Sequence, residues 1–367
     1  MTLLTENPTD RSLLPIIEKV QAGQRLSVED GLTLYESNDL LTIGQLANSV
    51  NLKKNGNHVY FIENMYINPT NVCEANCKFC GFRRDPDEEG AYTMSTDELL
   101  HYVEKNWKPT IREFHIVGGH NHTVSFDYYL DTIRVLKEHY PQATIKAYTG
   151  AEVVFFSQLS GLSVEDVLKE LIKAGSESLT GGGAEILTEN YRAKMSPEKA
   201  STDEWLNAHR VAHGLGLKTH ATMLYGSIES LEERLIHMER LRLLQDETNG
   251  FMVFIPLAVQ PKQASAGIKR RTSAFDDMKT IAISRLMLDN FQHIKAYWIN
   301  IGTQLTQMAL SFGSSDIHGT LVEERISHSA GALTQSALTR DELIWLIKGA
   351  GKQPVERDTF YNIIKEY

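Results

Sequence analysis

The spacing of hydrophobic residues along the chain changes near residue 56, from a helical pattern to short strand-like runs that alternate with helices. Over residues 10–55 they recur at helical spacing, as in Leu13, Ile17 and Val20. Ser27, three residues before Asp30, marks a second helix start, and residues 40–50 suggest a third helix. We therefore predict two parts: a helical N-terminal segment, residues 1–55, packed on a domain that comprises residues 56–367.

From about residue 58, short apolar runs alternate with long amphipathic stretches that begin at capping pairs such as Ser95 with Glu98. The apolar runs predict eight strands: Val59–Asn68, Glu113–Val117, Thr144–Tyr148, Ser176–Thr180, Lys218–Leu224, Gly250–Pro256, His293–Asn300 and a weak one at Leu310–Ser314. Eight strand–helix repeats favour an α/β fold, a (βα)8 TIM-type barrel that is irregular or partly open. An open doubly wound sheet is the alternative, because both folds use the βαβ unit. Two helices, near Thr339–Lys348 and Arg357–Tyr367, are expected to close the barrel's end.

Composition and charge disfavour several classes of function and location. The formal net charge of −10 argues against general nucleic-acid binding, which usually shows a basic surplus. No apolar run is long enough to cross a membrane, and the first residues do not resemble a secretory signal, so a cytoplasmic location is expected. The three cysteines are an odd number and fall within eight residues, which disfavours disulfides and favours a metal centre.

The cysteine loop carries the strongest chemical signal. Cys73, Cys77 and Cys80 follow the first predicted strand with C-x3-C-x2-C spacing. Three thiolates can bind three irons of a four-iron cluster and leave the fourth iron open to an outside ligand. The position supports this interpretation, because barrel active sites form in the loops after the carboxyl ends of strands.

A structural zinc site is the alternative for the same cysteines. It would need a fourth ligand such as His58 or His115. Zinc sites more often pair two C-x-x-C units, so the cluster is the favoured interpretation.

Two glycine-rich turns follow later strands. The second strand ends in Gly118-Gly119-His120, where glycines let the backbone approach a ligand. The fourth strand runs into residues 181–185, Gly-Gly-Gly-Ala-Glu, whose Glu185 could contact a ribose hydroxyl or the substrate. Glu185 could equally begin the next helix, where acids are favoured.

Candidates for substrate binding are less specific. Guanidinium groups grip carboxylates in a two-point fork, so four arginines are candidate clamps, although most are expected on the surface. They are Arg192, Arg210, Arg270 and Arg271. The loop 314–320, with Asp316, His318 and Thr320 and followed by Glu323-Glu324, could also reach the substrate, although helix capping would explain Asp316 and Thr320.

A local basic patch lies beside the cysteines. Lys78, Arg83 and Arg84 could dock an acidic one-electron donor such as flavodoxin or ferredoxin. Balancing the negative charge of a cluster is an equally good interpretation.

The cysteine spacing after a first barrel strand, with the aromatic Phe79 before the last cysteine, resembles the radical S-adenosylmethionine (SAM) superfamily. The resemblance implies that Cys73, Cys77 and Cys80 hold a 4Fe-4S cluster whose open iron binds SAM. It also implies that Phe79, Gly118, Gly119 and Glu185 contact SAM. The superfamily often has Gly-Gly-Glu at the second strand, so the role of His120 stays open.

Less specific sequence segments indicate a branch within that superfamily. Residues 66–73, 222–226 and 254–257 resemble its futalosine and deazaflavin branch, and residues 90–95, 117–120 and 181–185 resemble the aminodeoxyfutalosine synthase family of menaquinone biosynthesis. The similarity covers the chain from about residue 15 to its end. Dehypoxanthine futalosine cyclase and the radical SAM subunit of FO synthase are the alternatives, and a zinc-stabilised, non-catalytic barrel is a remote one.

The resemblance implies a reaction. The reduced cluster gives an electron to SAM, and the 5′-deoxyadenosyl radical adds to the enolpyruvyl double bond of 3-[(1-carboxyvinyl)oxy]benzoate. Attack on the ring, rearrangement and decarboxylation then give aminodeoxyfutalosine. SAM is therefore consumed as a co-substrate, and the partners are this aromatic ether and a one-electron donor.

Overall fold

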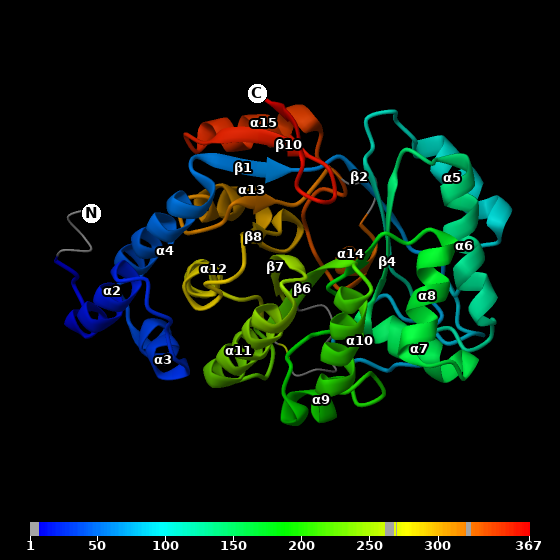
Figure 1. Cartoon of the computed structure of the whole chain (residues 1–367), viewed down its shortest axis with the longest axis horizontal. Helices are drawn as coiled ribbons and strands as arrows, with labels where there is room; N and C mark the ends of the chain where they lie inside the picture. Colours follow the sequence, from blue (N-terminus) through cyan, green and yellow to red (C-terminus); the bar gives the residue numbers. More distant parts are fainter. Residues whose placement is uncertain (1–6, 261–267, 269, 321–323) are drawn as a thin grey trace.

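The computed structural model describes residues 7–260, 268, 270–320 and 324–367 (Figure 1). Parallel strands alternate with helices, as the sequence predicts. The strands are β1 (His58–Phe61), β2 (Asn64–Ile67), β3 (Glu113–Ile116), β4 (Thr144–Thr149), β5 (Ser178–Thr180), β6 (Lys218–Tyr225), β7 (Phe251–Ala258), β8 (His293–Ala296), β9 (Asp316–Ile317), β10 (Gln353–Arg357) and β11 (Ile363–Glu366). All neighbouring pairs are parallel except β10 and β11.

The first predicted strand, Val59–Asn68, is split in two and joins the two edges of the sheet. Its first half, β1, pairs with β9 and β10, whereas its second half, β2, pairs with β3. Ile62 and Glu63 lie between the two halves. The eight strand positions therefore form a curled sheet, an irregular and partly open (βα)8 barrel, which confirms the predicted fold class.

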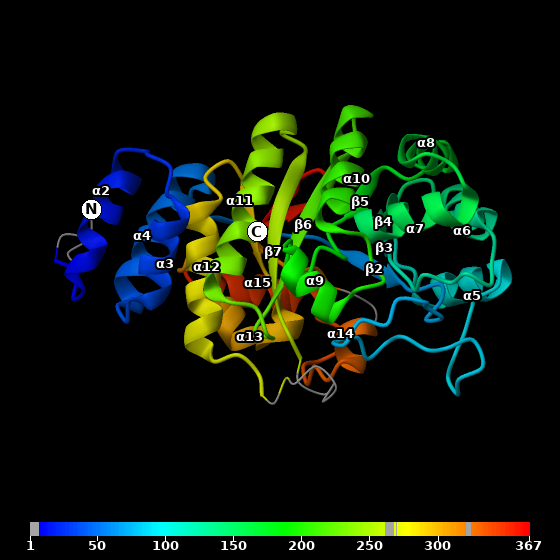
Figure 2. The same ribbon diagram turned by 90° about the horizontal axis from the view of Figure 1, so that it is seen from below.

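Helices surround this sheet (Figure 2). Those after β2 are α5 (Thr96–Asn106), α6 (Phe126–His139), α7 (Gly150–Ser160), α8 (Val164–Ala174), α9 (Glu189–Met195), α10 (Thr202–Gly214), α11 (Leu231–Thr248), α12 (Ala274–Met287), α13 (Trp298–Ala309), α14 (Ile326–Ser329) and α15 (Arg340–Gly349). The capping signals are confirmed: Ser95 caps α5, Ser163 caps α8 and Ser201 caps α10. No described helix is long and apolar enough to span a membrane.

The N-terminal residues form the predicted helices. They are α2 (Leu14–Gln21), α3 (Val28–Glu36) and α4 (Leu40–Asn55), preceded by a 3₁₀ turn at Arg11–Leu13, and Ser27 with Asp30 makes the predicted capping box on α3. In Figure 1 they lie at one side of the molecule, and α3 and α4 pack against α11 and α12. The boundary at residue 55 between two parts of the chain stays a prediction.

Near the C-terminus one predicted strand is shorter than expected, and two predicted elements are wrong. The strand at His293–Asn300 ends at Ala296 because α13 begins at Trp298. The predicted strand Leu310–Ser314 is a turn, and the eighth strand is Asp316–Ile317. The predicted helix Arg357–Tyr367 is wrong: Arg357 ends β10, and the chain then turns back so that β11 pairs antiparallel with the edge of β10, whose other edge pairs with β1.

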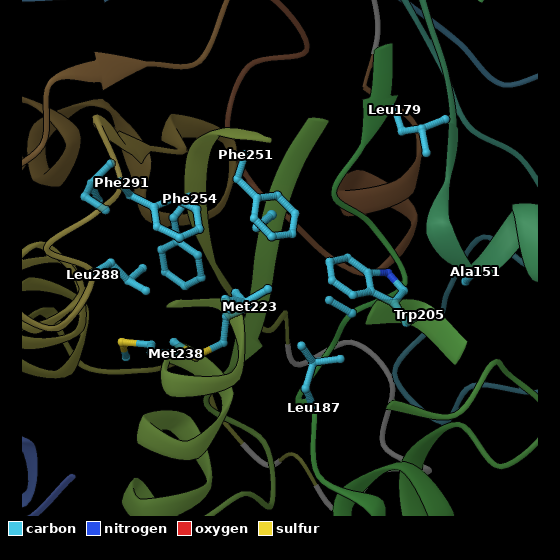
Figure 3. Close-up of a cluster of buried hydrophobic side chains, with 14 of the residues drawn as sticks. Ala151, Leu179, Leu187, Trp205, Met223, Met238, Phe251, Phe254, Leu288 and Phe291 are labelled. Carbon is cyan, nitrogen blue, oxygen red and sulfur yellow. The ribbon is translucent and has the colours of Figure 1, made fainter. Parts of the chain in front are cut away.

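The apolar core lies between the strands and the helices. Figure 3 shows Trp205 of α10 and Met238 of α11 against Met223 of β6 and Phe254 of β7. The space enclosed by the strands is different, because it contains buried charged side chains such as Lys146 and Asp316. The barrel therefore packs its apolar atoms outside the sheet and keeps polar chemistry inside it.

Candidate active site

The three cysteines lie in the loop after β2, and this loop contacts both α9 and α14. Lys78 N–H donates to the Met195 carbonyl at the end of α9 (2.9 Å). A Cβ on Gly81 would meet the backbone of Ser329 in α14 at well under 3.0 Å. Figure 2 shows α9 and α14 close together, with the loop after β2 beside them. The loop is therefore held between two segments that lie far apart in the sequence.

Residues 90–93 brace this loop from behind. The Asn71 side chain accepts from Tyr92 N–H (2.7 Å) and donates to the Gly90 carbonyl (2.9 Å). Cys73 N–H donates to the Arg84 carbonyl (3.2 Å), and Arg84 N–H donates back to Asn71 (2.9 Å). These bonds fix the first part of the cysteine loop against residues 90–92.

All three cysteines line one cavity of about 270 Å³, together with Phe79 and both glycine turns. Cys77 is buried, and burial raises the pKa of its thiol to about 12. Among the residues that the structure describes, no three His, Cys, Asp or Glu groups converge on a point where one metal ion could bind. A zinc ion needs that convergence, whereas cluster cysteines each bind a different iron, so the donor set fits the cluster better. His58 lies elsewhere, 3.9 Å from Glu366 of β11.

The turn Gly118-Gly119 lies against the cysteine loop. Gly119 N–H donates to the Thr70 carbonyl (2.9 Å), and His120 N–H points at Cys73 Sγ (3.2 Å). The His120 ring stacks on Phe155 with centroids 4.7 Å apart, and burial lowers the pKa of this imidazole to about 3. His120 therefore orients Cys73 through its backbone, while its neutral ring packs against the protein.

Sequence analysis missed Glu152, the carboxylate behind this turn. Glu152 accepts from Gly118 N–H (2.9 Å) and Thr149 N–H (2.8 Å), and it forms the capping box of α7. Burial raises the pKa of Glu152 to about 7, although these donors favour its charged form. The Thr149-x-x-Glu152 pattern was the signal that could have revealed it.

Glu185 does not begin a helix, so that alternative is wrong. It has a φ of 49°, lines the cavity and accepts from Lys199 Nζ at 2.8 Å. Lys199, which no sequence motif marks, also lies over the Phe79 ring at 5.9 Å. Burial disfavours the ammonium, but Cys77 and Glu185 outweigh it and raise the pKa of Lys199. The result is a fixed cation beside the cysteines.

None of the four candidate arginines lines this cavity. Arg192 is buried and donates to the carbonyls of Gly183, Ala184 and Ala200, so it fixes the triple-glycine loop. Arg210 pairs with Glu247 on the surface, Arg270 is exposed, and the exposed Arg271 donates to the Gly331 carbonyl.

The loop 314–320 also departs from expectation. Asp316 is neither a cap nor a mouth residue, because it lies in β9 and pairs with Lys295 (3.0 Å) and Arg357 (2.7 Å) inside the barrel. The Thr320 hydroxyl accepts from Asn64 N–H, and His318 packs against Tyr66 and Tyr297. Glu324 does line the cavity, whereas Glu323 lies outside the described residues.

The basic patch is partly neutralised. Arg83 pairs with Asp85 (2.6 Å), and Arg84 lies 3.4 Å from Glu88. Docking of flavodoxin or ferredoxin on this patch therefore stays a prediction.

Comparisons with known proteins agree with this geometry. Residues 67–241 match the radical SAM superfamily, and residues 248–366 match the CofH/MqnC C-terminal region. The chain is 48% identical to an aminodeoxyfutalosine synthase from Thermus thermophilus, over 97% of each chain. It is 44% identical to one from Streptomyces coelicolor, over 95% of this chain and 93% of the other. The protein belongs to the aminodeoxyfutalosine synthase family of radical SAM enzymes.

The chain also resembles a related enzyme and, more distantly, a solved structure with the same fold. A cyclic dehypoxanthine futalosine synthase from Halalkalibacterium halodurans is 35% identical over 96% of this chain and 95% of its own. The crystal structure of methylornithine synthase superimposes with a TM-score of 0.71 at 19% identity, covering 92% of this chain and 96% of that one. This structural likeness supports the barrel fold alone. Radical SAM enzymes use a 4Fe-4S cluster, SAM, an electron donor and a small-molecule substrate, and this chain shares that chemistry as a member of the superfamily.

Replacing Gly119 by alanine should disrupt the site. Its Cβ would meet the Val72 carbonyl far inside van der Waals contact and lie 3.0 Å from Cys73 Cβ, so the cysteine loop must move. We expect SAM cleavage to fall by at least about tenfold, because displacements on the order of 1 Å are costly for reacting groups. Gly214→Ala is the control: no atom lies within 4 Å of its added Cβ, and it should leave the rate unchanged. Equal rates in the two variants would contradict this packing.

Proposed function

We propose that this protein is an aminodeoxyfutalosine synthase that couples SAM to 3-[(1-carboxyvinyl)oxy]benzoate. The observation that carries the proposal is one cavity that begins at three cysteines and continues past two glycine turns into the polar barrel interior. The identities of 48% and 44% to synthases, against 35% to the cyclic dehypoxanthine enzyme, favour this member of the branch.

Cys73, Cys77 and Cys80 would hold the cluster. When bound, the cluster and SAM supply the one-electron cleavage that yields the 5′-deoxyadenosyl radical. Lys199 provides a fixed positive charge beside the thiolates, where the cluster and the SAM carboxylate add negative charge. Glu152 holds the Gly118 N–H, so the glycine turn is rigid before SAM arrives.

Phe79, Gly118, Gly119 and Glu185 would contact SAM. All four line the same cavity as the cysteines. The Glu185 carboxylate is pinned by Lys199, so its second oxygen can accept from a ribose hydroxyl without reorienting. The remaining cavity, walled by Tyr66, Leu224 and Tyr297, would enclose the aromatic substrate and exclude water from the radical.

A product assay tests the proposal. The reconstituted protein is incubated anaerobically with SAM, dithionite and the enolpyruvyl benzoate, and the products are analysed by mass spectrometry. We expect a product that retains the adenosine carbon skeleton, because the radical adds to the double bond rather than removing hydrogen. Release of 5′-deoxyadenosine with dehypoxanthine futalosine, and no adduct with the benzoate, would favour the cyclase instead.

A further inference from the structure

The part of the cavity that lies among strands β3, β5 and β6, called its closed end below, is lined by side-chain atoms for which the described residues offer no hydrogen-bond partner. His115 of β3, Thr180 of β5 and His220 of β6 all line the cavity and are buried or nearly so. Within the described residues, three of their side-chain atoms lack a hydrogen-bond partner: His115 Nδ1, Thr180 Oγ1 and His220 Nε2. Buried polar atoms are normally satisfied, so these three indicate a ligand at this end.

The surrounding structure fixes these donors. The His115 ring stacks on Tyr66 with centroids 4.1 Å apart and an interplanar angle of 23°. Burial lowers the pKa of both His115 and His220, so each imidazole is neutral and keeps one N–H to donate. A ligand that accepts hydrogen bonds from several directions would suit this end of the cavity.

A buried charge cluster lies behind the histidines, outside the cavity lining. It contains the pair Lys146–Glu113 (2.6 Å) and Asp316 bound by Lys295 and Arg357. Three cationic side chains face two carboxylates. Despite burial, nearby cations lower the pKa values of Glu113 and Asp316, which keeps both ionised. Burial lowers the pKa of Lys295 and lowers that of Lys146 to about 8. Lys146 and Lys295 both disfavour protonation of His115 and His220. The closed end of the cavity is therefore electropositive, and the positive charge comes from buried side chains that ion pairs hold in place.

Glu324, one of the carboxylates that line the cavity, is itself paired with a cation. Glu324 lines the cavity, but its carboxylate accepts from Ser327 N–H and lies 3.4 Å from His328. The hydrogen bond to Glu324 raises the pKa of His328 to about 9, so this imidazole is protonated and neutralises Glu324 at pH 7.

We propose that the ring carboxylate of the substrate binds at this closed end, on His115, His220 and Thr180. The assignment rests on the proposed function, which supplies a substrate with two carboxylates. It replaces the arginine clamp that the sequence suggested, because neutral donors over a fixed positive charge can hold a carboxylate without a guanidinium. It also directs the enolpyruvyl end of the substrate toward the cysteines.

A binding cycle tests the assignment without relying on turnover. Dissociation constants are measured anaerobically on the reconstituted holoenzyme with SAM, for 3-[(1-carboxyvinyl)oxy]benzoate and for the phenyl ether that lacks the ring carboxylate. For the wild type we expect the ring carboxylate to tighten binding on the order of 100-fold. In the double variant H115F/H220F, this ratio should fall to within about threefold, because the donors are gone.

Matched variants separate binding from folding. H209F removes another buried histidine, on α10, which bonds Thr219 and does not line the cavity, so the 100-fold ratio should survive. If the double variant does not fold, the single variants H115F and H220F should each lower the ratio by roughly tenfold.

The outcomes are distinct. An unchanged ratio in the histidine variants, or equal binding of both ligands by the wild type, overturns the carboxylate site. A histidine-dependent ratio without any adduct in the product assay supports the carboxylate site and rejects the proposed reaction.

Discussion

Replacing Cys73, Cys77 or Cys80 by alanine is expected to abolish SAM cleavage. The chain has no fourth cysteine to substitute, so each change leaves one iron without its protein ligand. Each variant should also lose the iron and sulfide of a four-iron cluster after anaerobic reconstitution, together with the brown colour. We expect activity to fall by more than about a thousandfold, because the radical has no other source.

Asn76→Ala is the matched control for this series. Asn76 lies in the same loop, between two of the cysteines, but its side chain is exposed. It should retain iron content and the rate of SAM cleavage. Full cleavage by any cysteine variant, or a colourless wild-type protein that contains zinc, would end the cluster assignment.

The largest expected effect on stability comes from Asp316→Asn. Asp316 is fully buried and forms ion pairs with Lys295 and Arg357, so its loss leaves two buried cations without their counter-charge. Removing one member of a buried ion pair typically costs about 3–5 kcal/mol. We expect the free energy of unfolding, measured with denaturant at pH 7, to fall by about that amount.

The same argument fixes the pH dependence. Burial alone would raise the pKa of Asp316, but Arg357 and Lys295 outweigh it and hold the pKa below its ordinary value. A depressed pKa stabilises the fold above the unfolded value of about 3.9, and this contribution is lost as the pH falls toward the folded pKa. The difference between wild type and D316N should therefore shrink below about pH 4.

Asp289→Asn provides the comparison for this variant. Asp289 pairs with Arg25, and both side chains are 41% exposed, so its loss should cost at most about 1 kcal/mol. Similar losses in the two variants would contradict the role assigned to the buried ion pairs.

Local patterns predicted the elements whose signals are local. The capping pairs at Ser95 and Ser201 mark α5 and α10, and six of the apolar runs coincide with strands β3 to β8. Elements that depend on distant partners were predicted wrongly. Residues Ile363–Glu366 form a strand because β10, which itself pairs with β1, offers them an edge, and no local period encodes that pairing.

The residues of the active site also fall into those that the sequence indicated and those that it did not. The cysteines with Phe79 and the glycine turns stand out as short local patterns, and the structure places them around one cavity, while their contacts to the cluster and SAM stay predictions. Lys199 was missed because its partner Glu185 lies in another loop, and Glu152 was missed because its bond to Gly118, unlike its local capping bond to Thr149, cannot be read from the sequence. The arginine candidates illustrate the same limit: the sequence gives the charge of Arg192, but its three carbonyl partners decide that it supports a loop.

The amino-acid sequence by itself determined the cysteine spacing, the alternation of strands and helices, and the family. These properties depend on neighbouring residues or on the order of elements along the chain. Only the tertiary structure decided which charges are buried together and which polar atoms lack partners. A parallel barrel turns side chains from eight separate strand positions inward, so charge balance and hydrogen-bond satisfaction are set in three dimensions.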